Sequence, residues 1–252
     1  MAVSGGQLKS EESDRYSRQV AIPGFGRAGQ QKLKAAHAVV AGLGGLGSPV
    51  SIYLAAAGVG HLTIIDAQRV ELSNLNRQML HWGLDIGQPK VKSATKKLRA
   101  INSNIKVNGI FEKITSENVV QLVKGTDVVV DGLDNYSTRY LLNETCVRNN
   151  IPFIHGAVEG LRGQLMTILP GKGPCLKCAV PKEPPKKPAF PVLGATPGVI
   201  GCLQAMEAIK LITGIGKPFV GKMLIFNGMD MTFDEIKVNR DPNCQVCGKR
   251  GR

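Results

Sequence analysis

The stretch from His37 to Asp66, HAVVAGLGGLGSPVSIYLAAAGVGHLTIID, constrains the fold of this chain more than any other. It contains a short apolar run, a glycine-rich turn, an alanine-rich run with helical spacing, and a second apolar run that ends in an acid. This order is typical of a βαβ unit. We therefore expect a Rossmann-like, doubly wound α/β sheet that binds a nucleotide where the first strand meets the helix.

The glycines of this turn indicate how a nucleotide would bind. Gly42, Gly44 and Gly47 fit G-x-G-x-x-G, in which the first glycine makes the turn, the second admits a phosphate and the third lets helix and strand pack closely. The following helix would point its free amides at a polyphosphate. Gly45 belongs to the same predicted site, and Asp66 has the spacing of a carboxylate that binds ribose. The pattern does not say which nucleotide is bound, and NAD or FAD is its commonest occupant.

Length and composition favour one soluble domain. A chain of 252 residues can bury a substantial core, and no apolar run reaches the roughly 20 residues of a membrane-spanning helix. The first residues also lack the apolar centre of a signal peptide. We expect a cytoplasmic protein with a flexible tail at 1–13 and a single domain at 14–252. The formal charge of +13 is spread out and not interleaved with aromatics, which favours a solvated surface or an acidic protein partner over nucleic acid.

Four of the six cysteines form two C-x-x-C pairs, Cys175 with Cys178 and Cys244 with Cys247. In an intracellular protein, two such pairs favour a structural zinc site with four thiolates over disulfides. The zinc would tie the end of the chain to its middle and leave no open position for catalysis. A redox-active pair is the weaker alternative, because neither pair lies in a thioredoxin-like context.

Polar residues follow the second strand of the predicted unit. Residues 67–91 show no sustained helical or strand periodicity. They would start at the carboxyl end of the second strand, which is the edge of the sheet where ligands bind. Arg77 and Lys90 would bring positive charge to that edge, and Asn74 and Gln78 would bring neutral hydrogen-bonding groups. The competing interpretation is an ordinary charged, solvated loop.

Asp134 follows another buried strand, predicted at 126–131. A carboxylate at the carboxyl end of a central strand is well placed to hold Mg²⁺ or to orient a phosphate. The alternative is that Asp134 caps the helix predicted at 136–150.

The remaining pattern predicts a mostly parallel sheet extended by antiparallel strands. We expect further strands at 105–111, 151–156, 163–169, 222–226 and 231–238, and further helices at 14–20, 30–36, 90–101, 116–124 and 199–214. The strand at 163–169 is expected to be antiparallel. Residues 179–197, with six prolines, predict a mobile crossing segment over the substrate side.

With these pieces in place, the chain resembles the HesA/MoeB/ThiF family, the bacterial and archaeal relatives of ubiquitin-activating enzymes, and within it most closely the adenylyltransferases of sulfur-carrier proteins. The matching stretches are RYSRQV at 15–20, GLGGLGS at 42–48, SNLNRQ at 73–78, GQPKV at 87–91, DGLDN at 131–135, GVIGCLQAMEAIK at 198–210 and both cysteine pairs. The glycine turn alone is unspecific, but the ordered set is highly specific.

The resemblance implies ATP-dependent adenylation of the C-terminal glycine of a small ubiquitin-fold carrier protein ending in Gly-Gly, with release of pyrophosphate. Arg77 and Lys90 would neutralise phosphate charge, Asp134 would hold Mg²⁺, and Asn74 would contact a phosphate. In relatives, the arginine that matches Arg18 enters the active site of the partner subunit, which implies a homodimer.

One departure from the family pattern bears on the later steps. Many relatives carry a cysteine in the crossing segment that links covalently to the carrier, and residues 179–201 contain none. We therefore expect a separate sulfur donor and no covalent role for Cys202. Three alternatives stay open: an NAD- or FAD-dependent oxidoreductase, an enzyme that adenylates a carboxylate on a modified tRNA base, and a module that binds a ubiquitin-like protein without activating it. Molybdopterin, thiamine, tRNA-thiolation and protein-modifying pathways all use the implied chemistry.

Overall fold

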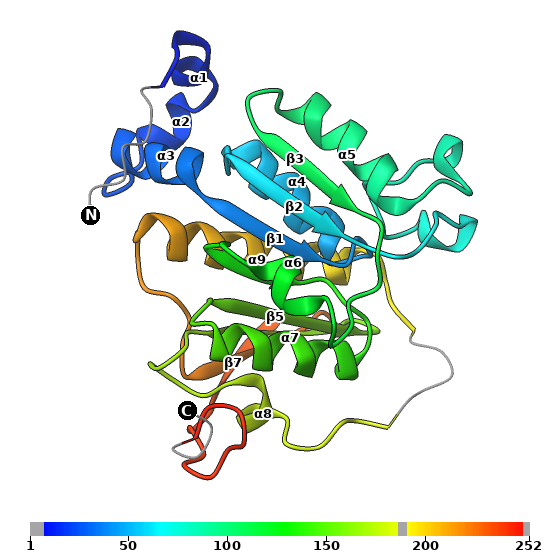
Figure 1. The fold of residues 1–252 in the computed structure, drawn as a ribbon, viewed down its shortest axis with the longest axis vertical. Coiled ribbons are helices and arrows are strands. Elements are labelled where there is room, and N and C mark those ends of the chain that lie inside the picture. Colours follow the sequence, from blue (N-terminus) through cyan, green and yellow to red (C-terminus); the bar gives the residue numbers. More distant parts are fainter. Residues whose placement is uncertain (1–7, 186–190, 249–252) are drawn as a thin grey trace.

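A mixed β-sheet runs through the centre of the computed structural model, which describes residues 8–185 and 191–248 (Figure 1). Within these residues the sheet has eight strands in the order β3-β2-β1-β4-β5-β6-β7-β8. The strands are β1 (His37–Ala41), β2 (His61–Ile65), β3 (Lys106–Ile110), β4 (Val128–Asp131), β5 (Phe153–Glu159), β6 (Arg162–Ile168), β7 (Lys222–Asn227) and β8 (Thr232–Lys237). The pairs among β1 to β5 are parallel, and β6, β7 and β8 pair antiparallel. The predicted fold class is therefore confirmed.

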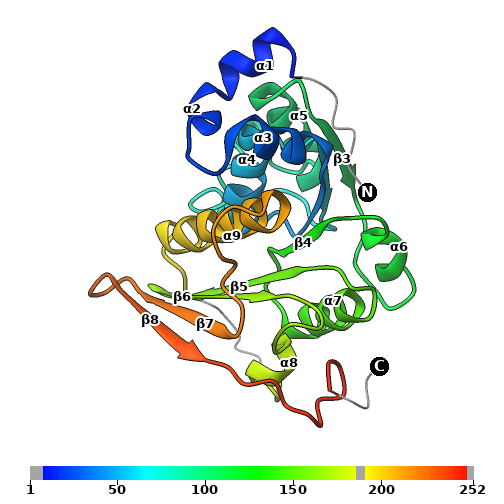
Figure 2. The ribbon, with the colours of Figure 1, turned by 90° about the vertical axis from the view of Figure 1, so that its left-hand side faces the viewer.

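Helices cover both faces of the sheet (Figure 2). One face carries α3 (Gly26–Ala35), α4 (Gly47–Ala57), α5 (Lys90–Ile101) and α9 (Ala195–Thr213), and the other carries α6 (Val119–Val123), α7 (Tyr136–Arg148) and α8 (Leu176–Ala179). Along β1, Ala38 and Val40 pack into the first of these cores, whereas Val39 and Ala41 pack into the second. Burial on both faces explains why β1 is apolar from Ala38 to Ala41.

The order of the strands fixes where a ligand can bind. The chain runs outward from β1 to β2 and β3, and then returns to place β4 on the other side of β1. Connections therefore diverge between β1 and β4, and an open α/β sheet binds its ligands beyond the carboxyl ends of the strands at such a point. Residues 67–89 cross this end with only the short 3₁₀ turns η1 (Leu72–Asn74) and η2 (Gly83–Asp85) in the described structure, as expected.

The N-terminal region differs from the sequence-based expectation. The helix expected at 14–20 is two helices, α1 (Ser10–Arg15) and α2 (Ser17–Val20), and α1 begins inside the stretch expected as a tail. The break falls at Tyr16, because its side chain is buried and its hydroxyl accepts a hydrogen bond from Asn102 Nδ2 at 2.8 Å. Residues 1–7 lie outside the described residues.

Other boundaries also differ from the prediction: α6 begins three residues later and β5 ends three residues later than expected. Helix α3 begins four residues before the expected start, and α9 begins at Ala195, inside the predicted crossing segment. Pro197 occupies the first turn of α9, where the missing amide hydrogen of a proline costs no intrahelical bond. The crossing segment is thus shorter than predicted, and its residues 186–190 lie outside the described structure. None of the helices in the described part of the chain combines the length and apolar character needed to cross a bilayer.

Candidate functional site

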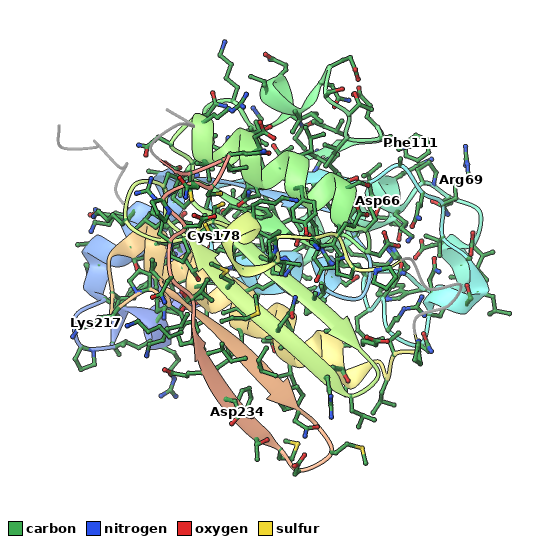
Figure 3. All side chains as sticks on the ribbon, turned by 90° about the horizontal axis from the view of Figure 1, so that it is seen from below. Asp66, Arg69, Phe111, Cys178, Lys217 and Asp234 are labelled. Carbon is green, nitrogen blue, oxygen red and sulfur yellow. The ribbon has the colours of Figure 1, made fainter. Side chains whose placement is uncertain are left out.

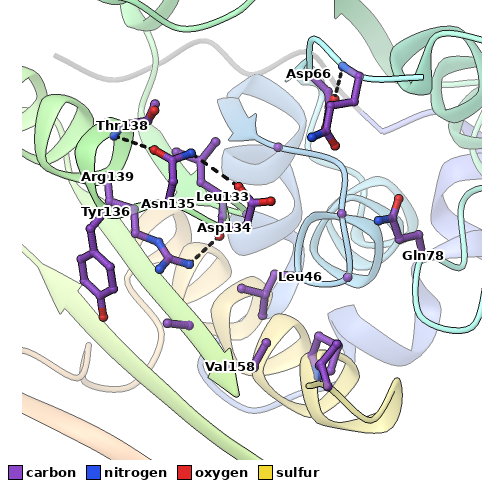
Figure 4. Close-up of a pocket in the computed structure, with 18 of the residues that line it drawn as sticks. Leu46, Asp66, Gln78, Leu133, Asp134, Asn135, Tyr136, Thr138, Arg139 and Val158 are labelled. Carbon is purple, nitrogen blue, oxygen red and sulfur yellow. Dashed lines mark hydrogen bonds between the residues drawn. The ribbon is translucent and has the colours of Figure 1, made fainter. Parts of the chain in front are cut away.

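A pocket of about 740 Å³ opens at the carboxyl ends of the central strands (Figure 4). It extends from the glycine-rich turn after β1 to the walls formed by α7, β5 and β6. Eight of the predicted residues line it: Gly42, Gly44, Gly45, Asp66, Arg77, Gln78, Lys90 and Asp134. The structure therefore brings together residues from five separate stretches of the sequence.

The glycines of the turn have the separate roles expected from their spacing. Gly42 has a φ of +93°, and a Cβ there would lie 2.6 Å from the carbonyl oxygen of Gly132. A Cβ on Gly47 would lie 1.8 Å from the carbonyl oxygen of Gly42. At Gly44 the nearest atom to such a Cβ is 3.8 Å away. The protein itself therefore needs glycine at the first and third positions, whereas the second leaves open space for a ligand.

Asp66 holds the glycine-rich turn in place. One oxygen of its carboxylate accepts a hydrogen bond from the amide of Leu43 at 2.8 Å, and the other accepts one from the amide of Gln68 at 2.7 Å. The carbonyl oxygen of Leu43 accepts a hydrogen bond from His81 Nε2 at 3.1 Å. The peptide groups around Leu43 are thus fixed by two side chains from distant segments, and His81 is a contributor that the sequence pattern did not single out.

Lys90 is a buried cation on the wall of the pocket. It is only 2% exposed, and its Nζ donates a hydrogen bond to the neutral side-chain oxygen of Gln68 at 2.7 Å. Burial lowers its pKa from the ordinary value, although Asp66 and Asp134 oppose that shift. A buried ammonium group in contact with a neutral amide favours an incoming anion as its partner.

Arg77 and Gln78 lie beside the turn. The guanidinium of Arg77 donates hydrogen bonds to the carbonyl oxygen of Ser73 and to Asn76 Oδ1, both at 2.8 Å. Gln78 is 4% exposed, and among the described residues nothing hydrogen-bonds to its Oε1 (Figure 4). Because an unpaired buried oxygen is unfavourable, a ligand with a hydrogen-bond donor would be stabilised there.

Asp134 does not cap helix α7. The cap is Asn135, whose Oδ1 accepts a hydrogen bond from the amide of Thr138 at 2.9 Å (Figure 4). The Asp134 carboxylate is exposed, and its oxygen lies 3.5 Å from Asn135 Nδ2. Since the competing role belongs to Asn135, the carboxylate at the pocket remains available to a cation or a ligand.

Three predicted residues, Gly47, Asn74 and Arg18, lie outside the pocket lining as described. Gly47 packs directly behind the turn. Asn74 is buried, and its side chain closes the η1 turn by accepting from the amide of Glu71 at 3.1 Å. Arg18 is exposed on α2, and Figure 1 shows α2 at the opposite end of the sheet. Within one chain, Arg18 is remote from the site.

The sequence pattern missed a buried polar network behind the pocket. Asp131 and His155 are both fully buried, and His155 Nδ1 lies 2.7 Å from Asp131 Oδ2. Arg139 Nε donates to the same oxygen at 3.0 Å. The signal was an acid and a histidine inside the apolar strand runs VVVD and FIHG, because such groups are buried only when they are paired.

The four paired cysteines form a cluster separate from the pocket. Their Sγ atoms all lie within 4.8 Å of one another, with Cys175 to Cys244 at 3.7 Å and Cys178 to Cys247 at 3.4 Å. Thiolates bound tetrahedrally to zinc lie about 3.8 Å apart, so the donor set fits such an ion. Figure 3 shows Cys178 well apart from Asp66. The cluster therefore joins two distant parts of the chain without contributing to the pocket wall.

Comparison with known proteins identifies the family. The ThiF family profile matches residues 16–246. The chain belongs to the ThiF family. This ThiF-family protein is 42% identical to the SAMP-activating enzyme E1 of Haloferax volcanii over 97% of this chain and 92% of the relative. It is 43% identical to the sulfur carrier protein adenylyltransferase of Thermus thermophilus, over 94% of this chain and 92% of the relative. The resemblance stated from the motifs is confirmed.

Solved structures agree with this assignment. A crystal structure of E. coli MccB with a MccA variant has a TM-score of 0.85 and 27% identity, over 93% of this chain and 75% of that chain. E. coli MccB with ATP has a TM-score of 0.84 and 28% identity, over 95% of this chain and 75% of that chain. These relatives and neighbours favour an ATP-using adenylyltransferase over the NAD- or FAD-dependent oxidoreductase that the glycine turn alone allowed.

The ThiF-family protein should lose stability as the pH falls below about 6.5. Burial lowers the pKa of all four histidines, His155 among them, from the ordinary value of 6.5. The unfolded chain therefore binds protons that the folded chain does not, and the free energy of unfolding rises with pH up to about 6.5. In His155→Asn this slope should be smaller by about 1 kcal/mol per pH unit. Urea unfolding at several values between about pH 5 and 7 measures the slope of the free energy of unfolding against pH. A slope that is the same in the wild type and in His155→Asn would contradict the buried, neutral state of His155.

Proposed function

We propose that this ThiF-family protein uses ATP to adenylate the C-terminal glycine of a small ubiquitin-fold sulfur-carrier protein that ends in Gly-Gly. The buried cation Lys90, which faces the glycine-rich turn together with Arg77 and Asp134, is the observation that carries this proposal. Support also comes from the relatives that are named as a sulfur carrier protein adenylyltransferase and an activating enzyme. A cytoplasmic location, where ATP is available, suits the proposal.

The chemistry accounts for the charges of the site. A carboxylate oxygen of the carrier attacks the α-phosphorus of ATP, a new bond forms between them, and the bond to the β-phosphate oxygen breaks to release pyrophosphate. Two anions must meet, so neutralisation of charge and correct positioning matter more than a general base. Lys90 and Arg77 would supply fixed positive charge at the pocket, which Gly44, Gly45 and Leu46, just before α4, also line.

Asp134 is the residue proposed to hold Mg²⁺. Its carboxylate is exposed at the pocket, and this ion is usually held by one or two carboxylates together with substrate phosphates. When bound, the ion would neutralise phosphate charge. Asp66 would bind the ribose on the β2 side of the turn, and Gln78 Oε1 would accept a hydrogen bond from the bound substrate.

Lys90→Ala and Asp134→Ala should each reduce carrier-dependent ATP:pyrophosphate exchange by about a hundredfold or more. The first removes a positive charge that would stabilise the transition state, and the second removes the carboxylate proposed to hold Mg²⁺. The assay uses the sulfur carrier protein of Thermus thermophilus as the substrate. Lys92→Ala is the matched control, because Lys92 is exposed on the same helix and does not line the pocket. Full exchange by either pocket variant, or exchange by the wild type with a carrier that lacks its last two residues, would refute the proposal.

Arg18 is proposed to act in the site of a partner subunit in a homodimer. It is exposed and far from the pocket of its own chain, and the family resemblance gives the matching arginine this role. The arm formed by α1 and α2 is anchored through Tyr16, so it could present Arg18 in a fixed position.

Mixing Arg18→Ala with Lys90→Ala subunits should restore exchange that neither variant shows alone. In a mixed dimer, one site receives its Lys90 from one chain and its Arg18 from the other. Random reassembly of two equally abundant variants would restore about a quarter of the wild-type rate. Refolding the variants together and measuring pyrophosphate exchange tests this, and a mixture no more active than its separate components would place Arg18 in cis or outside the reaction.

The sulfur donor is proposed to be a separate protein. Cys202 lies on α9 outside the described lining of the pocket, and burial raises its pKa above the ordinary value. A raised pKa makes a thiol a weaker nucleophile at neutral pH. The adenylate would therefore be released from the site to an external sulfur nucleophile.

The four-cysteine cluster is proposed to hold a structural zinc ion. Four thiolates at tetrahedral spacing leave no position for water or substrate, so the zinc would stabilise the fold without taking part in catalysis. It would attach the end of the chain to α8, beside the second apolar core.

Cys175→Ser should abolish the binding of about one zinc per chain and lower the thermal unfolding midpoint, because the metal-binding free energy contributes to folding. Metal content by mass spectrometry and calorimetry provide the readouts. Cys202→Ser is the matched control, since Cys202 lies outside the cluster, and it should keep both the zinc and the midpoint. Equal zinc content in the two variants would exclude this site.

A further inference from the structure

On the wall of the pocket opposite the glycine-rich turn, two uncharged side chains are hydrogen-bonded to each other. Tyr136, at the start of α7, and Gln164, on β6, both line the pocket, and Figure 4 shows Tyr136 across it from the turn. Gln164 Nε2 donates a hydrogen bond to the Tyr136 hydroxyl at 3.2 Å and lies 3.1 Å from His155 Nε2. These two side chains are therefore joined to the buried network behind the pocket.

The buried network decides which atoms carry hydrogens. Burial would raise the pKa of Asp131, but Arg139 and His155 hold that pKa below its ordinary value. Burial lowers the pKa of His155. Asp131 is thus a carboxylate and His155 is neutral, with its proton on Nδ1, from which it donates to Asp131 Oδ2. His155 Nε2 is consequently an acceptor.

Both amide hydrogens of Gln164 are then committed. One is donated to His155 Nε2 and the other to the Tyr136 oxygen. Because the Tyr136 oxygen accepts this bond, its own hydrogen is free to point elsewhere, and Gln164 Oε1 remains an acceptor. The Tyr136 and Gln164 pair therefore offers one donor beside one acceptor to the pocket. A phosphate presents only acceptors, whereas a peptide group presents one acceptor and one donor.

The order of the strands indicates which part of the substrates reaches this wall. Asp66, the proposed ribose ligand, follows β2, and Gln164 lies on β6, four strands further along the sheet. Adjacent strands lie about 4.8 Å apart, so about 19 Å separates these positions. With the α-phosphate at the turn between β1 and β4, the nucleoside occupies the β2 side. The attacking carboxylate must then come from the β5 and β6 side.

We propose that Tyr136 and Gln164 position the carrier by binding a peptide group within its C-terminal tail. The Tyr136 hydroxyl donates to the carbonyl oxygen of that group, and Gln164 Oε1 accepts from its amide. Small and apolar neighbours on the same wall, Ala157 and Val158, leave room for a glycine-rich tail. This assignment rests on the proposed adenylation of a carrier, and it gives the polar wall the role of fixing the tail while the turn fixes the nucleotide.

The test measures the KM for each substrate in pyrophosphate exchange with the Thermus thermophilus carrier. Tyr136→Phe and Gln164→Leu should each raise the KM for the carrier about tenfold, the effect of losing one hydrogen bond, and leave the KM for ATP unchanged. Tyr140→Phe is the matched control. Tyr140 lies one turn later on α7 and is not among the described residues that line the pocket. Its hydroxyl donates a hydrogen bond to the carbonyl oxygen of Val180 at 2.9 Å.

An ester scan of the carrier separates direct binding from a structural effect. Semisynthetic carriers replace one of the three C-terminal peptide bonds by an ester, which removes the amide donor. At one of the three positions, the ester should raise the KM of the wild type for the carrier about tenfold relative to the all-amide carrier. The same ester should cause no further rise in the KM of Gln164→Leu. A higher KM for ATP, or additive effects of ester and variant, would overturn the inference alone. Absence of exchange by the wild type would overturn the proposed function and the inference with it.

Discussion

The close contact between two backbone turns is the constraint on which the site depends. The turn after β1 meets the turn after β4 so closely that a Cβ on Gly42 would lie 2.6 Å from the carbonyl oxygen of Gly132. This contact joins the two halves of the sheet at the point where their connections diverge. Asp66 and His81 hold the peptide groups around Leu43 from the outside. A ligand at the turn therefore meets a surface that is already fixed.

The pocket differs in chemical character on the two sides of this contact. On the β2 side lie Asp66 and the buried cation Lys90, and on the β6 side lies the wall that includes the uncharged side chains of Tyr136 and Gln164. Lys90 would stabilise negative charge on the β2 side. On the β6 side, Tyr136 offers a hydrogen-bond donor and Gln164 an acceptor. In the proposed adenylation, the attacking carboxylate and the nucleotide are both anionic. Separate approaches to a shared, positively charged centre would reduce their repulsion before reaction.

Much of the fold and of the β2 side of the pocket lining was predictable from the sequence, because the glycine spacing and the strand pattern are local signals. Asp66 and Lys90 were found because they follow or begin regular elements at the ligand-binding edge. For the His155 network, the sequence signals two buried polar groups, Asp131 and His155, but not which residues pair with them. The partners meet only after β4, β5 and β6 pair. Asn135 and Asp134 are adjacent, and only the geometry showed which of them caps α7.

The most direct test of the central claim follows one oxygen atom. The carrier is labelled with ¹⁸O in its terminal carboxylate, incubated with the protein and ATP, and the acyl product is trapped with hydroxylamine, which cleaves the bond between the carbonyl carbon and the AMP oxygen. If the carboxylate attacks the α-phosphorus beside Lys90, one ¹⁸O appears in AMP and none in pyrophosphate. The appearance of ¹⁸O in orthophosphate, or of unlabelled AMP together with the trapped product, would contradict attack of the carboxylate on the α-phosphorus.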